Sequence, residues 1–200
     1  MNHFTDKIPE MVVDYVKSIT EHKKLNIKVV KPRKTKHGDF RQINSNYTIT
    51  INHTNNKYRF LMILIHEIAH FSVLKKNIKE KPHGHHWKNE FKKLAKPILN
   101  NKVFPLDLLI LLKNHMVNPK SSFSYDSDLV KVLNKYDSNS DFTYLDEIKD
   151  GLRFKYENNK IFQKIKKRRK RYLCVDIQDR RKYLFIHHAK VQVLSLIRIS

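Results

Sequence analysis

The sequence is poor in the residues that build disulfide frameworks and flexible linkers. Its 200 residues include three glycines, six prolines and a single cysteine, Cys174. One cysteine excludes an intramolecular disulfide and also a zinc ribbon built from several cysteines. The scarcity of glycine and proline argues against low-complexity linkers, and a hydrophobic content of 40% is enough for a packed core. We therefore expect one folded domain, or one domain with a small module.

Long hydrophobic runs are also missing. The longest apolar stretches, residues 60–65 and 108–112, are too short to span a bilayer. The first six residues contain no basic segment leading into an apolar one, so we expect no signal peptide. These features predict a cytoplasmic location, including association with the nucleoid, and no membrane partner.

Acidic residues are the third shortage. The chain has 19 of them against 41 lysines and arginines, which gives a formal net charge of +22. The excess is uneven, because residues 1–120 carry +14, residues 121–150 carry −4 and residues 151–200 carry +12. Such an excess attracts polyanions through phosphate contacts and release of counterions. The alternative is compositional drift, since lysine and asparagine are abundant; we favour nucleic-acid contact.

The first 137 residues have the hydrophobic spacing of a mixed helix and strand domain. The spacing predicts helices over residues 8–20, 56–76, 87–95, 103–116 and 128–136. Residues 25–30 alternate in polarity and residues 47–51 are rich in β-branched side chains, so both segments are expected to be strands. A basic loop containing His37, Gly38 and Asp39 is expected between them.

From residue 143 onward the pattern becomes β-like. Short runs that predict strands occupy residues 152–156, 160–165, 171–177, 182–186 and 190–196. Turns are expected at residues 158–159 and 179–180. Five short strands in about 50 residues suggest a small barrel or a curled sheet. We place the boundary of this module near residues 138–148.

The segment His66-Glu67-Ile68-Ala69-His70 is the most informative motif. Histidines four residues apart on a helix lie on the same face, one turn apart, so both imidazoles can reach one Zn²⁺. Glu67 can then reach a water molecule at the metal and take its proton. The alternative is a pair of hydrogen-bonded core histidines beside a surface glutamate.

A catalytic zinc usually has three protein ligands, so a third is needed. A metzincin pattern fails, because it requires glycine and histidine where this chain has Val73 and Lys76. Glu90 in the next helix is one candidate. The better source is the loop that contains Pro82-His83-Gly84-His85-His86-Trp87, since it follows the motif helix and can fold back toward the metal.

Together the two motifs resemble the SprT-like family, which includes the Spartan-type proteases. The resemblance implies zinc ligation by His66, His70 and His83, with Glu67 as the catalytic residue. It also implies that Gly84 makes the tight turn and that Trp87 anchors the following helix. His85 and His86 would occupy variable positions, where exposed or supporting roles are expected.

The resemblance covers most of the chain. It implies an α+β fold with a minimal zincin-like core in residues 1–120. The charge and strand patterns add an acidic helical connector in residues 121–145 and a small basic β module in residues 146–200. The segments 171–175 and 181–185 are also similar to the tails of bacterial SprT-domain proteins. Some family members end in a cysteine-rich zinc ribbon, which Cys174 alone cannot build. Cys174 could bind metal with His187 and His188, but we expect a buried strand thiol.

The implied activity is that of a zinc-dependent metalloprotease, with one Zn²⁺, that cleaves DNA-bound or DNA-crosslinked proteins. Single-stranded DNA is the favoured nucleic acid, because aromatic faces in the β module could stack on unpaired bases. For these aromatics, which alternate along strands, a role in the core is nevertheless the stronger expectation: Phe162, Tyr172, Tyr183 and Phe185. Other readings are a non-catalytic, metal-containing nucleic-acid-binding or regulatory protein, and a general peptidase. The candidate DNA-contact residues form one basic run: Lys166, Lys167, Arg168, Arg169, Lys170 and Arg171.

Overall fold

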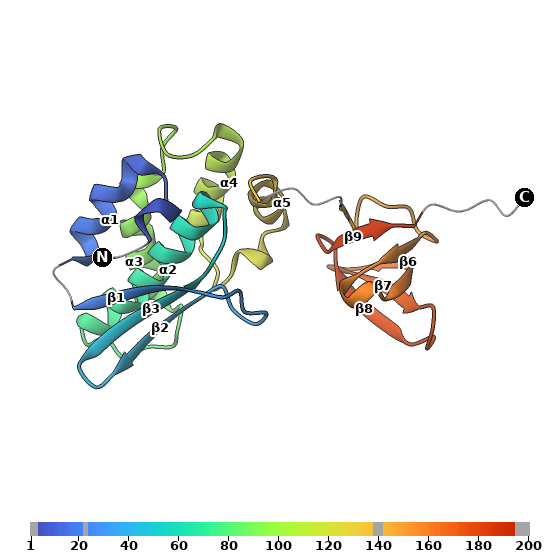
Figure 1. Cartoon of the computed structure of the whole chain (residues 1–200), viewed down its shortest axis with the longest axis horizontal. Helices are drawn as coiled ribbons and strands as arrows, with labels where there is room; N and C mark the ends of the chain where they lie inside the picture. The colour runs from blue at the N-terminus through green and yellow to red at the C-terminus, as the bar shows by residue number, and fades with distance from the viewer. Residues whose placement is uncertain (1–3, 22–23, 138–141, 195–200) are drawn as a thin grey trace, which may run out of the picture. The chain divides into compact units, whose positions relative to one another are not determined.

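The computed structural model describes residues 4–21, 24–137 and 142–194. The chain divides into two compact units, residues 1–138 and residues 139–200, which are described separately. The first unit contains helices and a short sheet, and the second is a β-sheet structure (Figure 1). The chain is thus an α+β protein, as the sequence predicts.

A three-stranded sheet forms one layer of the first unit. Its order is β1 (Leu25–Val30), β3 (Asn46–Asn52), β2 (Gly38–Ile43), with β1 parallel and β2 antiparallel to β3. The structure confirms the two predicted strands. The expected basic loop was wrong in part, because Gly38 and Asp39 begin β2. The last three residues of β2 are all exposed, Ile43 included. Backbone hydrogen bonds pair β2 with β3, and such bonds require no hydrophobic alternation in the sequence.

All five predicted helices are present in the first unit. The first one begins later than expected, because residues 10–12 form a 3₁₀ turn. Pro105 immediately precedes the fourth helix instead of lying in its first turn. The α-helices are α1 (Val13–Thr20), α2 (Lys57–Lys75), α3 (His85–Ala95), α4 (Leu106–Val117) and α5 (Ser127–Lys135).

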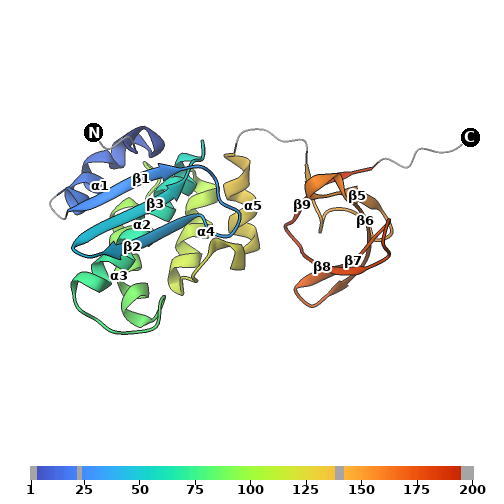
Figure 2. The same ribbon diagram turned by 60° about the horizontal axis from the view of Figure 1, so that its bottom comes forward.

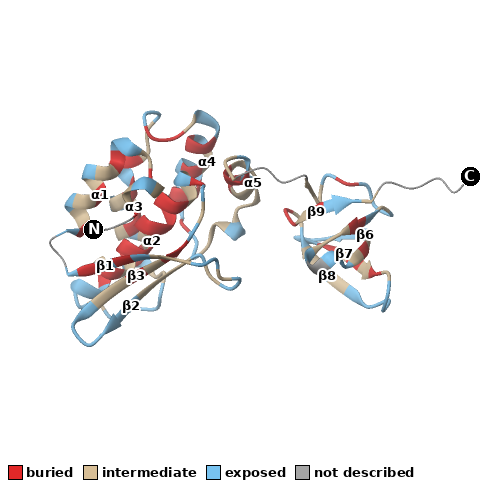
Figure 3. Ribbon diagram, in the orientation of Figure 1, coloured by how far each residue is buried: buried red, intermediate tan, exposed pale blue. Residues whose placement is uncertain are grey.

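Helix α2 is the centre of this unit. Residues 60–65 are all buried, because the helix packs against β2 and β3 on one side and α3 on another (Figures 2 and 3). Apolar side chains therefore lie on all sides of this part of the helix, as is typical of a helix enclosed in a core. This burial fixes the position of the helix and of the buried side chains that it carries.

The acidic segment 121–145 is not a separate connector in the structure. Helix α5 packs into the first core through the fully buried Leu129 and Leu133. Strand β4 (Thr143–Tyr144) pairs with β9 in the second unit. The segment therefore divides between the two units: α5 belongs to the first unit and β4 to the second. Residues 138–141 lie outside the described residues.

The second unit is one curled antiparallel sheet (Figure 2). The five predicted strands are confirmed, and the two-residue β4 is an addition. Among the described residues the paired strands end at β4 and β8, so the sheet is curled but open. The predicted last strand ends at Val193, and residues 195–196 lie outside the described part. In spatial order the strands are β4, β9 (Lys190–Val193), β5 (Arg153–Lys155), β6 (Ile161–Arg168), β7 (Arg171–Asp176) and β8 (Lys182–Ile186).

The helices of the described residues are all too short or too polar to cross a lipid bilayer.

Candidate metal centre

His66 and His70 lie one turn apart on α2, as their spacing predicts. Asn56 caps this helix, because its side chain accepts a hydrogen bond of 2.9 Å from the backbone N–H of Arg59. No glycine or proline interrupts the helix. The two imidazole rings, with centroids 5.1 Å apart, are only partly buried within an otherwise buried stretch of helix. A rigid helix therefore presents both histidines to the same space.

The loop after α2 returns His83 to these two side chains. The Nε2 atom of His83 lies 3.1 Å from Nε2 of His66 and 3.0 Å from Nε2 of His70. Two nitrogen ligands of a tetrahedral zinc ion lie roughly 3.3 Å apart, given zinc–nitrogen bonds of about 2.05 Å. The three nitrogens therefore have a separation that fits a shared metal ion.

Hydrogen bonding alone does not explain this arrangement. The Nε2 atom of a neutral imidazole either donates one hydrogen or accepts one, so His83 cannot form two ordinary hydrogen bonds with the same atom. Within the described part of the chain, His66, His70 and His83 are the group of potential ligands that converges on one point. The three histidines can thus hold a metal ion.

Backbone geometry at His83 explains how the loop turns back. His83 has φ of +62°, in the left-handed region that residues with a β-carbon rarely adopt. Gly84, which was expected to make the turn, has φ of −70° and is the residue before α3. A β-carbon at Gly84 would come within 2.5 Å of the Glu80 carboxylate. The glycine therefore allows the close approach of Glu80, and the tight turn lies at His83.

Trp87, in the first turn of α3, packs against the three histidines of the metal centre. It is 1% exposed, and its indole ring stacks on Phe91 at a centroid distance of 5.1 Å. Its Nε1 donates to the carbonyl oxygen of His66 at 3.4 Å, and its backbone N–H donates to Glu80 Oε1 at 3.0 Å. Trp87 therefore joins the beginning of α3 to the helix that carries two of the histidines.

Burial keeps the three imidazoles neutral near pH 7. Desolvation, with smaller contributions from the neighbouring histidines, lowers the pKa of His66 to about 2. Desolvation and then His83 lower the pKa of His70 to about 4, and desolvation also lowers the pKa of His83. Neutral imidazole is the form that binds metal.

Glu67 is buried beside the histidines and contacts β2. Desolvation raises the pKa of Glu67 to about 8, and the negative charge of Asp39 contributes in the same direction. The carboxylate accepts a hydrogen bond from the backbone N–H of Phe40. A β-carbon at Gly38 would come within 2.6 Å of Glu67 Oε1. The missing side chain of Gly38 thus lets β2 pass directly over the carboxylate.

These groups lie in an open cavity of about 820 Å³. Its walls are the segments 34–40, 80–83 and 120–124, together with α2. Lys34, Lys81 and Lys120 lie on three different walls, and Phe123 adds an apolar surface. A cavity of this size can admit a segment of polypeptide.

The other candidate ligands lie elsewhere. His85 and His86 are exposed; His86 contacts Glu80 through Nδ1 at 3.2 Å. Glu90 forms an ion pair with Lys76. Cys174 is fully buried, which raises the pKa of its thiol to about 12, as expected of a strand thiol in the core. None of these residues belongs to a metal-binding group among the described residues.

The basic run from Lys166 to Arg171 forms the end of the β6–β7 hairpin. All six side chains are exposed, and within the described chain none forms an ion pair. The aromatic residues of the same unit do not provide a stacking surface. Phe162 and Tyr172 are buried in the core of the second unit, and Tyr183 and Phe185 pack against them. Alternation along the strands turns these rings inward, so their role is in the core.

The sequence pattern did not identify the residues of β2 and of the loop before it as part of the site. Gly38 and Phe40 approach Glu67 from a strand about 30 residues earlier in the chain. One signal was available, because Gly38 is one of only three glycines in the sequence. Three neutral imidazoles and a buried carboxylate thus share one cavity. Comparisons with protein-family models, curated proteins and solved structures found no match.

Proposed function

We propose that this protein is a zinc-dependent metalloprotease of the SprT-like type, with a zincin-like core in its first unit. The observation that carries the proposal is the convergence of three Nε2 atoms beside a buried carboxylate in an open cavity. Two histidines from one helix and one from the next loop provide three ligands, as catalytic zinc sites require.

The ligand chemistry favours zinc over the hard cations. Imidazole nitrogen suits zinc, whereas magnesium and calcium prefer oxygen ligands. His66, His70 and His83 would hold the ion. When bound, zinc supplies Lewis-acid chemistry, because it polarises a carbonyl oxygen and makes water more acidic.

Glu67 has the position of a general base. Burial raises its pKa to about 8, and the charge of a zinc ion held by the three histidines would favour the ionised form that accepts a proton. Its carboxylate would take a proton from the attacking water as the new carbon–oxygen bond forms, and deliver it to the amine nitrogen as the carbon–nitrogen bond breaks. The hydrogen bond from the backbone N–H of Phe40 orients the carboxylate. Burial of Glu67 and its contact with β2 restrict it to this position.

Replacement of Glu67 by glutamine tests this assignment. The amide keeps the shape of the side chain but cannot accept a proton, so we expect zinc to remain bound and peptide cleavage to fall by at least about 100-fold. Metal content by mass spectrometry and cleavage of a denatured protein measure the two effects. Glu90→Gln, on α3 and paired with Lys76, is the control. Undiminished cleavage by Glu67→Gln would contradict the mechanism.

We also propose that the protein acts on DNA-associated proteins. The supporting observation is the β6–β7 hairpin, which exposes six adjacent cationic side chains. Phosphate groups would bind there through charge. Because the neighbouring aromatic rings are buried, the support for a preference for single-stranded DNA is weaker than the sequence suggested.

The alternative is a non-catalytic metal protein that binds nucleic acid. A combined assay separates the two functions: zinc analysis, followed by cleavage of a DNA-binding protein with and without single-stranded or duplex DNA. A protease of the proposed type cleaves faster when DNA is present. A general peptidase cleaves equally well without DNA, and a binding protein retains zinc without cleaving.

A further inference from the structure

A second cavity, of about 470 Å³, lies next to the metal centre. It is formed by the loop before β2, the end of β3, the first turns of α2 and the end of α5. His37 and Ile63 line both this cavity and the one that contains the histidine cluster. The two cavities therefore share a wall, and a polypeptide held at the metal centre has the second cavity within reach.

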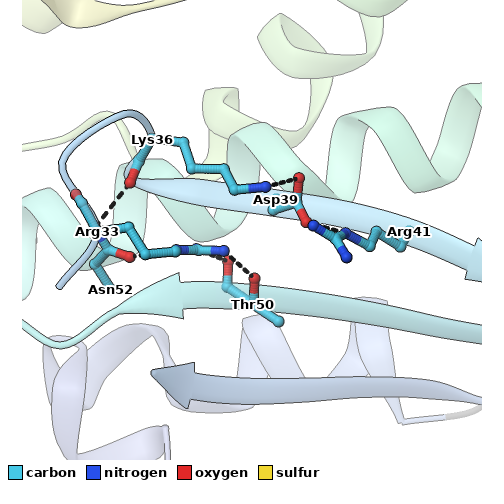
Figure 4. Close-up of polar contacts among 6 residues, drawn as sticks. All are labelled: Arg33, Lys36, Asp39, Arg41, Thr50 and Asn52. Atoms are coloured by element: carbon cyan, nitrogen blue, oxygen red, sulfur yellow. Dashed lines mark hydrogen bonds and ion pairs between the residues drawn. The ribbon is translucent and has the colours of Figure 1, made fainter. Parts of the chain in front are cut away.

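Arg33 in this second cavity has a fixed orientation. Its Nε donates to Asn52 Oδ1 at 2.8 Å and its Nη1 donates to Thr50 Oγ1 at 3.0 Å (Figure 4). Its Nη2 also contacts the carbonyl oxygen of Thr50 at 3.4 Å. Asn52 is itself buried and donates to the carbonyl oxygens of Arg33 and Lys36. The guanidinium is thus held by a network that also fixes its own loop.

Arg33 forms no ion pair with an acidic side chain within the described chain; its charge acts on the Glu67 carboxylate only at longer range. All the atoms that accept its hydrogen bonds are neutral. The neighbouring cationic side chains do form ion pairs. Lys36 and Arg41 both pair with Asp39, as Figure 4 shows. Arg59, also in the second cavity, pairs with Asp137 at 3.2 Å. An oriented guanidinium without an ion-pair partner is a binding group for an anion.

The charge of this cavity matches one carboxylate. Arg33 and Arg59 contribute two positive charges and Asp137 one negative charge. Desolvation lowers the pKa of His37, which keeps that ring neutral near pH 7. One net positive charge remains, and after its three hydrogen bonds Arg33 still has two of its five N–H groups to donate to a carboxylate.

We propose that the second cavity is a carboxylate-binding subsite, in which Arg33 binds an aspartate or glutamate side chain, or the terminal carboxylate, of the polypeptide held at the metal centre. This inference rests on the proposed protease function. Because the subsite shares a wall with the metal cavity, it would select substrates with an acidic group at one fixed distance from the cleaved bond.

The first experiment measures binding without cleavage. Labelled peptides that differ only in glutamate or glutamine at a single scanned position are titrated against the zinc-loaded full chain carrying Glu67→Gln. At one position we expect glutamate to bind about 10-fold more tightly than glutamine. Amidated and free-acid peptides separate the side-chain carboxylate from the terminal one. Adding Arg33→Gln abolishes the difference, whereas the matched control Arg41→Gln retains it.

Three results would overturn the subsite. The first is a glutamate preference that survives Arg33→Gln. The second is an equal loss of affinity for both peptides, which indicates a purely structural role. The third is binding of a 20-nucleotide single-stranded DNA that depends on Arg33, together with peptide binding that does not depend on Arg33. If Arg33→Gln fails to fold, Arg33→Lys replaces it: lysine lacks the two-pronged donor, so the preference falls at least about threefold, and an undiminished preference overturns the proposal.

Cleavage of the same peptides by the wild-type protein separates this inference from the proposed function. Cleavage with no glutamate preference overturns the subsite and leaves the protease assignment intact. An Arg33-dependent preference in binding, without cleavage of any peptide, overturns the protease assignment and leaves a carboxylate-binding cavity. Faster cleavage of the glutamate peptide supports both.

Discussion

At the scale of single residues, the candidate centre depends on positions whose side chains are small or unusually placed. His83 adopts a left-handed backbone conformation that costs about 1 kcal/mol or more, and this conformation directs its ring to the other two histidines. Gly38 and Gly84 instead allow close contact with Glu67 and Glu80. Substitutions at such positions should alter the site before they alter the fold.

Gly38→Ala should separate metal binding from activity. The new β-carbon would lie within 3 Å of Glu67 Oε1 and of Ile63, so the carboxylate has to move. We expect zinc content to remain unchanged and cleavage to fall by about 10- to 100-fold, because small displacements of catalytic groups are costly. Metal analysis and peptide cleavage measure this, with the exposed Gln42→Ala on the same strand as the control. If Gly38→Ala cleaves the peptide at the wild-type rate, the position of Glu67 is not critical and the prediction is wrong.

Cys174 should be unreactive in the native protein. Burial raises the pKa of its thiol to about 12, so the thiolate that reacts with disulfide reagents is scarce at pH 8. In the unfolded chain the thiol titrates near pH 8.5. The protonated thiol therefore favours the folded state below that pH, and this contribution is lost as the pH rises toward 12. A colorimetric thiol assay with and without denaturant tests the prediction; rapid native labelling would contradict it.

At the scale of elements, α2 connects the sheet, the metal centre and α5. Asn56 at its beginning is 1% exposed and serves two elements. Its oxygen caps α2, while its Nδ2 donates to the carbonyl oxygen of Leu133 at 2.7 Å and to Asp137 at 2.9 Å. Asn56 therefore fixes the start of α2 and also the contact of α2 with the end of α5.

Asn56→Ala should destabilise the first unit by about 2 to 3 kcal/mol. The change removes a helix cap and leaves a buried carbonyl oxygen without its donor. We expect a lower melting temperature by circular dichroism and a lower midpoint in urea. Asn114→Ala, at an exposed position of α4, is the matched control and should change stability by less than about 0.5 kcal/mol. Equal effects of the two substitutions would rule out the capping role.

At the scale of the whole molecule, each unit has its own hydrophobic core and its own candidate role. The histidine cluster, Glu67 and both cavities belong to the first unit. The exposed basic hairpin belongs to the second unit. The proposed chemistry and the proposed attachment to DNA are thus carried by separate parts of the chain and should be separable by mutation.

Neutralising the β6–β7 hairpin should weaken DNA binding without affecting the metal site. With Lys166, Lys167 and Arg168 changed to glutamine, we expect weaker binding to duplex and single-stranded DNA and a shallower dependence of affinity on salt, by about one unit of slope per lost phosphate contact. Zinc content and cleavage of a free peptide should not change. Fluorescence anisotropy at several salt concentrations provides the measurement. The exposed changes Lys93→Gln, Lys96→Gln and Lys102→Gln on the first unit provide a control of equal charge. An unchanged salt slope in the hairpin variant would contradict this role.

The sequence by itself determined those features that depend on local periodicity. Helix α2 places His66 and His70 on one face because the helical repeat is a local property, and β1 and β3 have the alternation of half-buried strands. The position of the loop after the motif helix favoured it over Glu90 as the source of the third ligand, and the resemblance selected His83 within that loop. The structure supports it through the convergence of the three Nε2 atoms.

Only the tertiary structure decided the features that depend on contacts between distant segments. The edge strand β2 has no hydrophobic alternation, and its approach to Glu67 follows from pairing with β3. Alternation along the strands puts Tyr172 and Phe162 on one face of the second sheet, and only the structure shows that this face encloses a core. Arg33 is one of many basic residues in the sequence, and its lack of an ion-pair partner emerges only when its neighbours are known. Burial and charge pairing are set by the whole fold, because they depend on which atoms exclude water and which charges lie nearby.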